Sequence, residues 1–163
     1  MKLSTILILS FIALSACDFN YPYTLADLPY AYDALEPNID KLTMTIHHDK
    51  HHLAYINNLN AAVKDNDWKK LSLESIFRIC SQAPVAIRNN GGGHWNHDFF
   101  WKTMKANGGG DPTGPLADAI KKTFGTFDAM RTAVNSAGTS RFGSGWTWLI
   151  SNNGRLSACS TAN

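Results

Sequence analysis

The most informative stretch of the sequence is residues 44–55, which read MTIHHDKHHLAY. Neither proline nor glycine interrupts residues 39–65, and apolar residues recur along one broad face, so the pattern predicts one long helix. On such a helix, His47, His51 and Tyr55 are spaced by four residues and share a face. The stretch therefore predicts a helix that presents a row of histidines.

All six histidines of the chain fall into two clusters. His48 and His52 form a second row beside the first, and His94 and His97 lie in residues 91–101, which read GGGHWNHDFFW. The spacing of three between the last two also places them on one helix face. Neutral imidazole is the commonest metal ligand, so two such faces across a helical hairpin could share one ion. Paired histidines at helical spacing are more often surface or core residues, but their concentration in two clusters favours a metal site.

Local propensity conflicts with a helix at the second cluster. Residues 91–93 are three consecutive glycines, and each disfavours a helix by about 1 kcal/mol relative to alanine. From propensity alone, a loop is expected there. Aromatic residues crowd the same cluster, and Trp146 and Trp148 could pack over it. These aromatic residues are interpreted as plain core, as an apolar shell around a metal, or as both.

The sequence lacks the motifs of several other enzyme classes. Asp49 and Lys50 stand between the first histidines, so the zinc-protease pattern His-Glu-x-x-His is absent. Glycines flank Ser144 directly, which is not the spacing of a nucleophile elbow. A hydrophobic content of 44% and a charged content of 17% indicate an ordinary globular protein. The net charge of +2, without a basic run, gives no reason to expect nucleic acid as a partner.

The first residues indicate export. Residues 1–16 combine one lysine, an apolar run and small residues at the end, which is the pattern of a secretory signal peptide. Residues 14–17, LSAC, also resemble a bacterial lipobox, in which a lipid on Cys17 would attach the protein to a membrane. We expect an exported, periplasmic or extracellular protein, with the lipid anchor as an open alternative. Cys80 and Cys159 are expected to be small buried residues rather than a disulfide.

A glycine-rich linker divides the remaining chain. Residues 107–112, NGGGDP, separate a helical domain at 21–106 from a second domain at 112–163. Further helices are expected at residues 71–81, 116–124 and 127–137. Pro37 suits the start of the long helix. Thr126 suits an N-cap. Strands are expected on either side of the hairpin signal Asn153-Gly154.

Several stretches of the sequence resemble one known family. They are residues 28–37 (LPYAYDALEP), 44–55, 88–97 (RNNGGGHWNH), 140–149 (SRFGSGWTWL) and 160–163 (STAN). Together they resemble the iron/manganese superoxide dismutases, from Tyr21 to Asn163. The resemblance implies an α+β fold, in which an N-terminal helical hairpin is followed by an α/β domain with a small antiparallel sheet. It also implies that residues 91–93 lie inside the second helix of the hairpin.

The resemblance implies a role for each candidate site residue. His47 would be the first metal ligand and His97 the second. Tyr55 would guard the entry of superoxide and hydrogen-bond close to the metal, with His51 beside it. The residues expected to line the pocket are Trp101 and Trp146.

The resemblance also implies the cofactor and the partners. One manganese or iron ion per subunit would oxidise one superoxide to oxygen and reduce the next to hydrogen peroxide. Gly93 occupies the position where iron-type members usually carry an outer-sphere glutamine, which favours manganese and leaves iron open. A homodimer or tetramer is expected for the full-length form.

The sequence departs from the family pattern at its C-terminal side. The third and fourth ligands of the family lie in an Asp-x-Trp-x-x-His motif, which occurs nowhere in the 163 residues. We therefore expect a C-terminally truncated member that binds metal weakly and is inactive by itself. Two alternatives stay open, namely a non-catalytic exported metal-binding protein and a structural lipoprotein.

Overall fold

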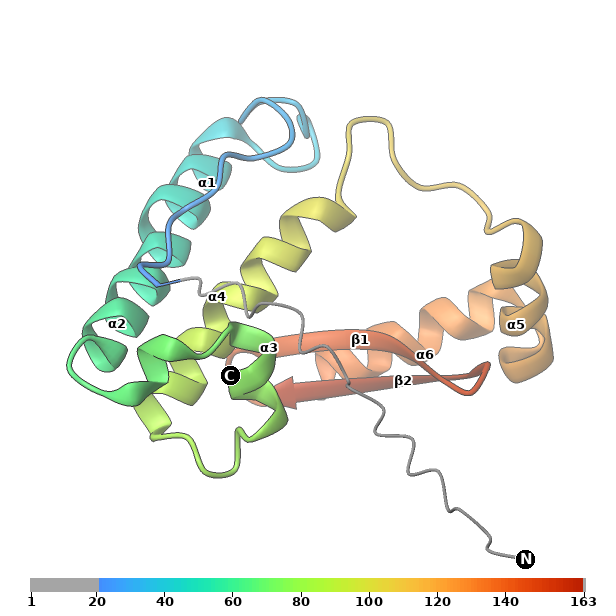
Figure 1. Cartoon of the computed structure of the whole chain (residues 1–163). Helices are drawn as coiled ribbons and strands as arrows, with labels where there is room; N and C mark the ends of the chain where they lie inside the picture. The colour runs from blue at the N-terminus through green and yellow to red at the C-terminus, as the bar shows by residue number, and fades with distance from the viewer. Residues whose placement is uncertain (1–20, 163) are drawn as a thin grey trace, which may run out of the picture.

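A computed structural model describes residues 21–162 of the chain. The expected signal peptide at residues 1–16 and the candidate lipidation site Cys17 lie outside the described residues. The fold is α+β, as predicted: a helical hairpin is followed by two further helices and a two-stranded antiparallel sheet (Figure 1). None of the helices within residues 21–162 combines the length and the apolar character needed to span a bilayer.

The first arm of the hairpin is a continuous helical rod in three segments. They are α1 (Lys41–Ile46), the π-helix η1 (His47–His52) and α2 (Leu53–Val63). The second arm is α4 (Val85–Thr103), which packs beside α2 (Figure 1). A short 3-10 helix, η2 (Asp67–Lys70), and α3 (Leu73–Arg78) connect the two arms. The hairpin thus brings the two histidine clusters face to face.

The predicted long helix differs from the structure at its start and in its middle. Asp40 is the N-cap, because its side chain accepts a hydrogen bond from the Thr43 N–H at 2.8 Å. Pro37 lies in the preceding turn, so its prediction as a helix start is wrong. In the middle, the Leu53 N–H reaches back five residues to the His48 carbonyl. This π geometry replaces the uninterrupted α-helix that the pattern predicts, and such insertions are frequent at functional sites.

The three glycines lie in the middle of α4, so the loop expected from local propensity is wrong. A Cβ on Gly91 would approach a Leu73 methyl group to 3.4 Å, and a Cβ on Gly93 would collide with the Tyr55 ring. Both positions therefore let α4 approach its neighbours closely, which offsets the propensity cost of about 1 kcal/mol per glycine. A Cβ on Gly92 would meet nothing within 4 Å, and packing gives no reason for a glycine there.

The second half consists of two helices and the sheet. Its elements are α5 (Gly114–Phe124), α6 (Phe127–Thr139), β1 (Gly145–Asn152) and β2 (Arg155–Ala162). Thr126 is confirmed as an N-cap, since its side chain accepts from the Ala129 N–H at 3.0 Å. The hairpin is confirmed as well: Asn153 and Gly154 have φ angles of 50° and 77°, as a type I′ turn requires.

Three buried clusters hold these elements together. The first joins the extended segment before α1 to α2, α3 and α4. Its members are Tyr23, Ile56, Leu59, Val63, Leu73, Ile76 and Ile87. The second, Leu35, Met44 and Trp101, lies against the histidine rows. The third, Ile120, Met130 and Leu156, attaches α5 and α6 to the sheet. Both cysteines of the described part are free, as expected, but neither is fully buried: Cys80 is exposed and Cys159 is partly buried.

Candidate metal centre

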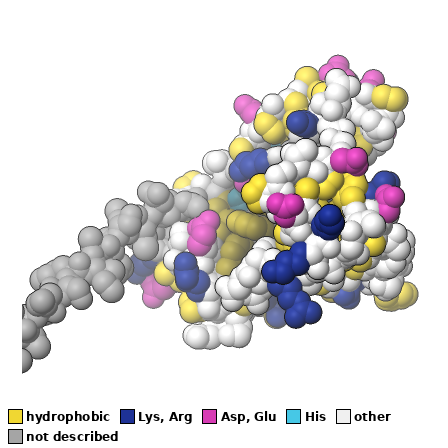
Figure 2. Space-filling view, turned by 90° about the vertical axis from the view of Figure 1, so that its right-hand side faces the viewer, with side chains coloured by type: hydrophobic (Ala, Val, Ile, Leu, Met, Phe, Trp, Pro, Cys, Tyr) yellow, Lys and Arg dark blue, Asp and Glu magenta, His cyan; other side chains and the backbone are white. Residues whose placement is uncertain are grey.

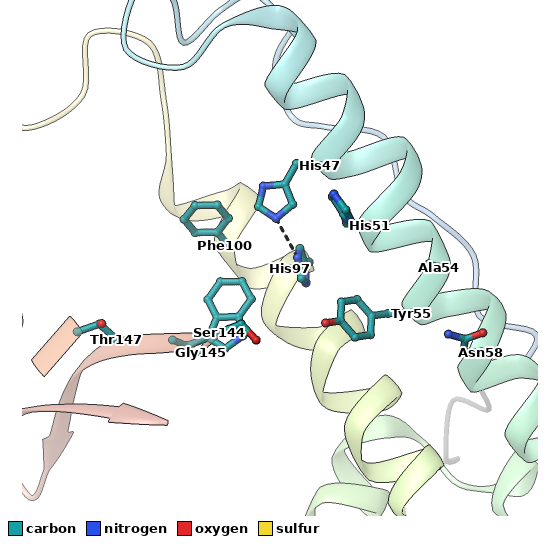
Figure 3. Close-up of a pocket in the computed structure, with 11 residues that line it drawn as sticks. His47, His51, Ala54, Tyr55, Asn58, His97, Phe100, Ser144, Gly145 and Thr147 are labelled. Carbon is teal, nitrogen blue, oxygen red and sulfur yellow. Dashed lines mark hydrogen bonds between the residues drawn. The ribbon is translucent and has the colours of Figure 1, made fainter. Parts of the chain in front are cut away.

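The structure brings together one histidine from each cluster. His47 projects from η1 and His97 from α4, and their Nε2 atoms lie 3.0 Å apart (Figure 3). The other ring nitrogen of His97, Nδ1, lies 2.7 Å from the Gly93 carbonyl and donates to it. A neutral ring with its proton on Nδ1 presents the Nε2 lone pair, so His97 directs a lone pair at the His47 ring.

The paired nitrogens fit one metal ion. Two ligand nitrogens that each lie about 2.1 Å from an ion, at a right angle, are separated by about 3.0 Å. The carbonyl of Gly93 also provides the hydrogen bond that commonly orients a ligand histidine through its second nitrogen. No group of three or more His, Cys, Asp or Glu side chains within residues 21–162 is arranged to hold an ion. The described residues therefore bring together two candidate ligands, His47 and His97.

Burial keeps both rings in the form that binds metal. Loss of hydration, and then repulsion by His97 and His51, lowers the pKa of His47 from 6.5 to about 4. Burial also lowers the pKa of His97. Both imidazoles are consequently neutral at physiological pH, with lone pairs free to coordinate a cation.

Aromatic rings form the wall around the two nitrogens. The Trp101 ring meets His47 edge-on, with centroids 4.9 Å apart, and Trp146 meets His97 edge-on at 5.1 Å. Phe100 completes the wall at 6.1 Å from His47. Trp101 is only 3% exposed. Both tryptophans expected at the pocket therefore lie against the candidate ligands: Trp146 lines the cavity, and buried Trp101 packs behind both histidine rings. The surroundings of the pair are largely apolar.

Tyr55 and His51 lie on the open side of the pair. They line a cavity of about 770 Å³ together with His47, His97, Phe100 and Trp146 (Figure 3). The Tyr55 ring is 5.3 Å from the His97 ring, and the exposed His51 ring is 6.1 Å from the His47 ring. Figure 2 shows a hollowed face of the molecule with hydrophobic side chains on the floor and a histidine at the margin. A small solute can thus reach the pair past a phenol and an imidazole.

Gly93 has two contacts that the sequence reasoning missed. Its carbonyl fixes the tautomer of His97, and its missing side chain leaves room for the Tyr55 ring. It lines a separate cavity on the far side of Tyr55, together with Arg88. Its place is therefore behind the site, where it contacts both the candidate ligand His97 and the Tyr55 ring.

The second histidine row supports the site from behind, and the sequence reasoning gave it no role. His48 is 2% exposed, and its ring nitrogens lie 2.7 Å from Asp49 Oδ1 and 2.9 Å from the Ala26 carbonyl. Both partners are acceptors, so each ring nitrogen of His48 faces a hydrogen-bond acceptor. The Tyr32 hydroxyl donates to the same carboxylate at 2.6 Å. Burial, and then this bond, raises the pKa of Tyr32 to about 12.

His52 is the more deeply buried member of that row, at 1% exposure. It lies between Trp101 and His94, with hydrogen bonds of 3.0 Å and 2.8 Å. Burial, and then repulsion by His94, lowers the pKa of His52 to about 3. The repeated spacing of four was the signal for this row, but spacing alone does not show which face is buried.

Two family models match the chain. They are "Iron/manganese superoxide dismutases, alpha-hairpin domain" over residues 22–105 and "Iron/manganese superoxide dismutases, C-terminal domain" over residues 112–163. Together these matches account for nearly all of the described residues.

Curated relatives agree with these models. The chain is 53% identical over 148 residues to "Superoxide dismutase [Mn] 1" of Leptolyngbya boryana, covering 87% of this chain and 60% of that protein. It is 51% identical over 132 residues to "Superoxide dismutase [Mn]" of Pseudomonas putida, covering 78% and 65%. A "Superoxide dismutase [Fe]" of Synechocystis sp. is 48% identical over 143 residues, covering 86% and 72%. The chain thus spans less than two thirds of the length of the first two relatives. With both halves matched and about half of all aligned residues identical, the chain belongs to the iron/manganese superoxide dismutase family.

Proposed function

We propose that the protein converts superoxide to oxygen and hydrogen peroxide at one manganese or iron ion per subunit. The observation that carries the proposal is the pair of Nε2 atoms, His47 and His97, 3.0 Å apart in a chain of this family. When bound, the ion supplies the one-electron oxidation and the one-electron reduction that dismutation needs. The residues of the chain bind and orient that ion, limit access of water and handle protons.

The residues around the two histidines divide this work between them. Trp101 and Trp146 pack edge-on against the two ligand rings and keep water from their sides. Tyr55 and His51 line the open side, where superoxide enters. Formation of hydrogen peroxide consumes two protons, and the Tyr55 hydroxyl and the His51 ring nitrogens are hydrogen-bonding groups placed to hold a proton near the bound anion. Tyr55 is thus assigned the role of gatekeeper, with His51 as its neighbour on the same rod.

We propose that the site prefers manganese to iron. A side chain at position 93 would collide with the Tyr55 ring, so this chain has no room there for the glutamine of iron-type members. Relatives named for manganese and for iron are both about half identical to the chain, which supports either ion as an occupant. Refolding the metal-free chain with equimolar Mn²⁺ and Fe²⁺, and then measuring the bound metals, tests the preference. An excess of bound iron would contradict it.

Location and assembly are further proposals. We propose export through residues 1–16, with Cys17 as the candidate lipid attachment site, on the strength of the sequence pattern. Self-association into a dimer or tetramer is supported by Phe142, which is 98% exposed two residues before cavity-lining Ser144. Sedimentation of the wild-type chain and of Phe142→Ser tests this, since only the variant should be monomeric at low concentration.

The test of function separates metal binding from turnover. Because the Asp-x-Trp-x-x-His motif is absent from the sequence, the chain is compared with a version extended by the C-terminal segment of a family member that carries it. We expect Mn²⁺ binding in both forms, tighter in the extended one, and dismutation in the extended form. His47→Ala and His97→Ala should abolish both properties, whereas exposed Lys121→Ala should change neither. Turnover that survives His47→Ala would overturn the proposal, and binding without turnover in the extended form would favour a non-catalytic metal-binding protein.

A further inference from the structure

A chain of three hydrogen-bonded rings, Trp101, His52 and His94, lies behind the candidate metal ligands, and the proposed mechanism uses neither of its histidines. Trp101 Nε1 lies 3.0 Å from His52 Nδ1, and His52 Nε2 lies 2.8 Å from His94 Nδ1. His52 and Trp101 are 1% and 3% exposed. Hydrogen bonds in such a sealed place are costly to leave unmade, because no water replaces a missing partner.

The indole fixes the direction of both bonds. An indole N–H can only donate, so His52 Nδ1 must accept. The neutral His52 ring then carries its proton on Nε2 and donates it to His94 Nδ1. His94 lines a second cavity, of about 540 Å³, that shares no lining residue with the cavity at the metal site. The chain of bonds therefore runs from a different surface of the hairpin inward to Trp101.

The inner end of this chain touches both candidate ligands. The Trp101 ring is 4.9 Å from His47, at an interplanar angle of 80°, and 5.9 Å from His97. The His52 ring stacks on His97, with centroids 5.4 Å apart and planes 19° apart. The backbone of Trp101 has a separate hydrogen bond, because its carbonyl accepts from the Tyr30 hydroxyl at 3.0 Å. The indole plane has its own hydrogen bond, from Nε1 to His52 Nδ1.

We propose that His52 and His94 are positioning residues, whose hydrogen bonds set the plane of the Trp101 indole and thereby the orientation of the His47 ring. The part of this inference that concerns the metal rests on the proposed function. A purely space-filling role would require only a side chain of similar size at position 52. The positioning role requires an acceptor where Nδ1 now lies, and this difference makes the proposal testable.

The indole N–H resonance of Trp101 reports directly on the first bond. Nitrogen-15 NMR of the metal-free chain should show five indole signals, one for each tryptophan, and Trp101→Phe assigns the relevant one. His52→Leu keeps the bulk but removes the acceptor, so the Trp101 proton should move upfield, toward the position of a free indole. His52→Asn places an amide oxygen near the former Nδ1 and should restore most of the shift. Trp148, which donates to Thr161 Oγ1 at 3.0 Å, is an internal reference that should not move.

Substitutions of His94 test the outer end of the three hydrogen-bonded rings. His94 is less buried than His52, so His94→Ala should fold even if His52→Leu does not. Without its acceptor, the His52 proton is no longer held on Nε2, and the Trp101 signal should shift in the same direction by a smaller amount. His94→Asn, which keeps an acceptor, should reverse that shift. A Trp101 signal that stays in place in His94→Ala, or that moves equally in His52→Leu and His52→Asn, would overturn the proposal.

Metal affinity provides the link to the site. Loss of an outer partner of a ligand typically weakens metal binding by about 10-fold or more. We expect Mn²⁺ to bind about 10-fold more weakly to His52→Leu than to the wild type, with His52→Asn close to the wild type. Equal affinities in all three would refute the step from Trp101 to His47. Failure of the wild-type chain to bind Mn²⁺ would sink the proposed function, but would leave the NMR result on the metal-free chain intact.

Discussion

Two adjacent glycines of α4 provide a matched test of how tightly this helix packs against Tyr55. Replacing either Gly92 or Gly93 with alanine raises helix propensity by the same amount, about 1 kcal/mol. A Cβ at position 92 meets no atom within 4 Å, whereas one at position 93 collides with Cγ, Cδ1 and Cε1 of the Tyr55 ring. Because Cγ is the atom that joins the ring to the rest of the side chain, rotation of the ring alone cannot relieve the collision.

The expected change in stability combines two terms, the gain in helix propensity and the cost of the steric collision. Overpacking of this kind costs about 1–3 kcal/mol. Gly92→Ala should therefore stabilise the chain by about 1 kcal/mol, while Gly93→Ala should destabilise it by about 0–2 kcal/mol after the same propensity gain is counted. The propensity terms cancel in the comparison, which leaves a gap of about 1–3 kcal/mol. With a urea m value of about 2 kcal/mol/M, a gap of 2 kcal/mol separates the unfolding midpoints by about 1 M.

The assay is urea unfolding of both variants and the wild type, followed by far-UV circular dichroism in one buffer. Equal midpoints for Gly92→Ala and Gly93→Ala would refute the packing argument. They would also remove the steric support for manganese, since a side chain at position 93 would then fit beside Tyr55. A second readout is turnover of the extended form, which should fall only in Gly93→Ala because only that variant displaces the gateway ring.

Three further predictions concern charge and backbone. Asp49→Asn removes the carboxylate 2.7 Å from the buried His48 ring. It should lower the free energy of unfolding in urea by about 1–2 kcal/mol at neutral pH. This is the lower part of the usual range, because Asp49 is partly exposed. Hydrogen bonds from Tyr32 and His48 lower the pKa of Asp49. This stabilisation is therefore present above the ordinary aspartate pKa of about 3.9 and is lost as the pH falls below it. A stability difference between wild type and Asp49→Asn that persists undiminished at pH 2 would contradict this. Burial lowers the pKa of His47 to about 4, so the metal-free chain should lose stability as the pH drops from about 6.5 to 4, and His47→Gln should flatten that part of the thermal-unfolding profile. Gly154→Ala places a side chain at φ 77° and should cost about 1 kcal/mol, seen as a lower melting temperature; an unchanged value would argue against the left-handed turn.

Local sequence signals predicted the elements whose structure depends on local physics. The Asn153-Gly154 turn follows from the ability of these residues to adopt positive φ, and the Thr126 cap from a hydroxyl next to free backbone N–H groups. The glycine-rich part of α4 could not be predicted in this way. Its helical state depends on contacts with Leu73 and Tyr55, which are distant in sequence, and propensity scales contain no such contacts.

The pairing of the two histidine clusters was predictable, but the division of labour within the first cluster was not. Regular spacing indicates that residues share a face, and the family resemblance selected His47 and His97 as candidate ligands. It gave no indication that His48 is buried between Asp49 and the Ala26 carbonyl, or that His52 accepts the hydrogen bond of the Trp101 indole. Asp49 is the sequence neighbour of His48, but Ala26 and Trp101 meet the rings only after α4 and the segment before α1 have packed on the rod.

The period of the buried residues shows why the rod is not a plain α-helix. The buried side chains of its first half are Met44, His48, His52 and Ile56, a strict spacing of four. In an α-helix of 3.6 residues per turn, a step of four overshoots by about 40°, so three such steps drift about 120° from the starting face. The wider turn of η1 absorbs that drift, because its hydrogen bonds span five residues instead of four. After η1 the buried positions return to steps of three and four, at Leu59 and Val63. The π segment therefore lets one row of histidines remain buried as support, while the row beside it, His47 and His51, stays on the cavity side. In the sequence, the unbroken spacing of four was the signal for this π segment.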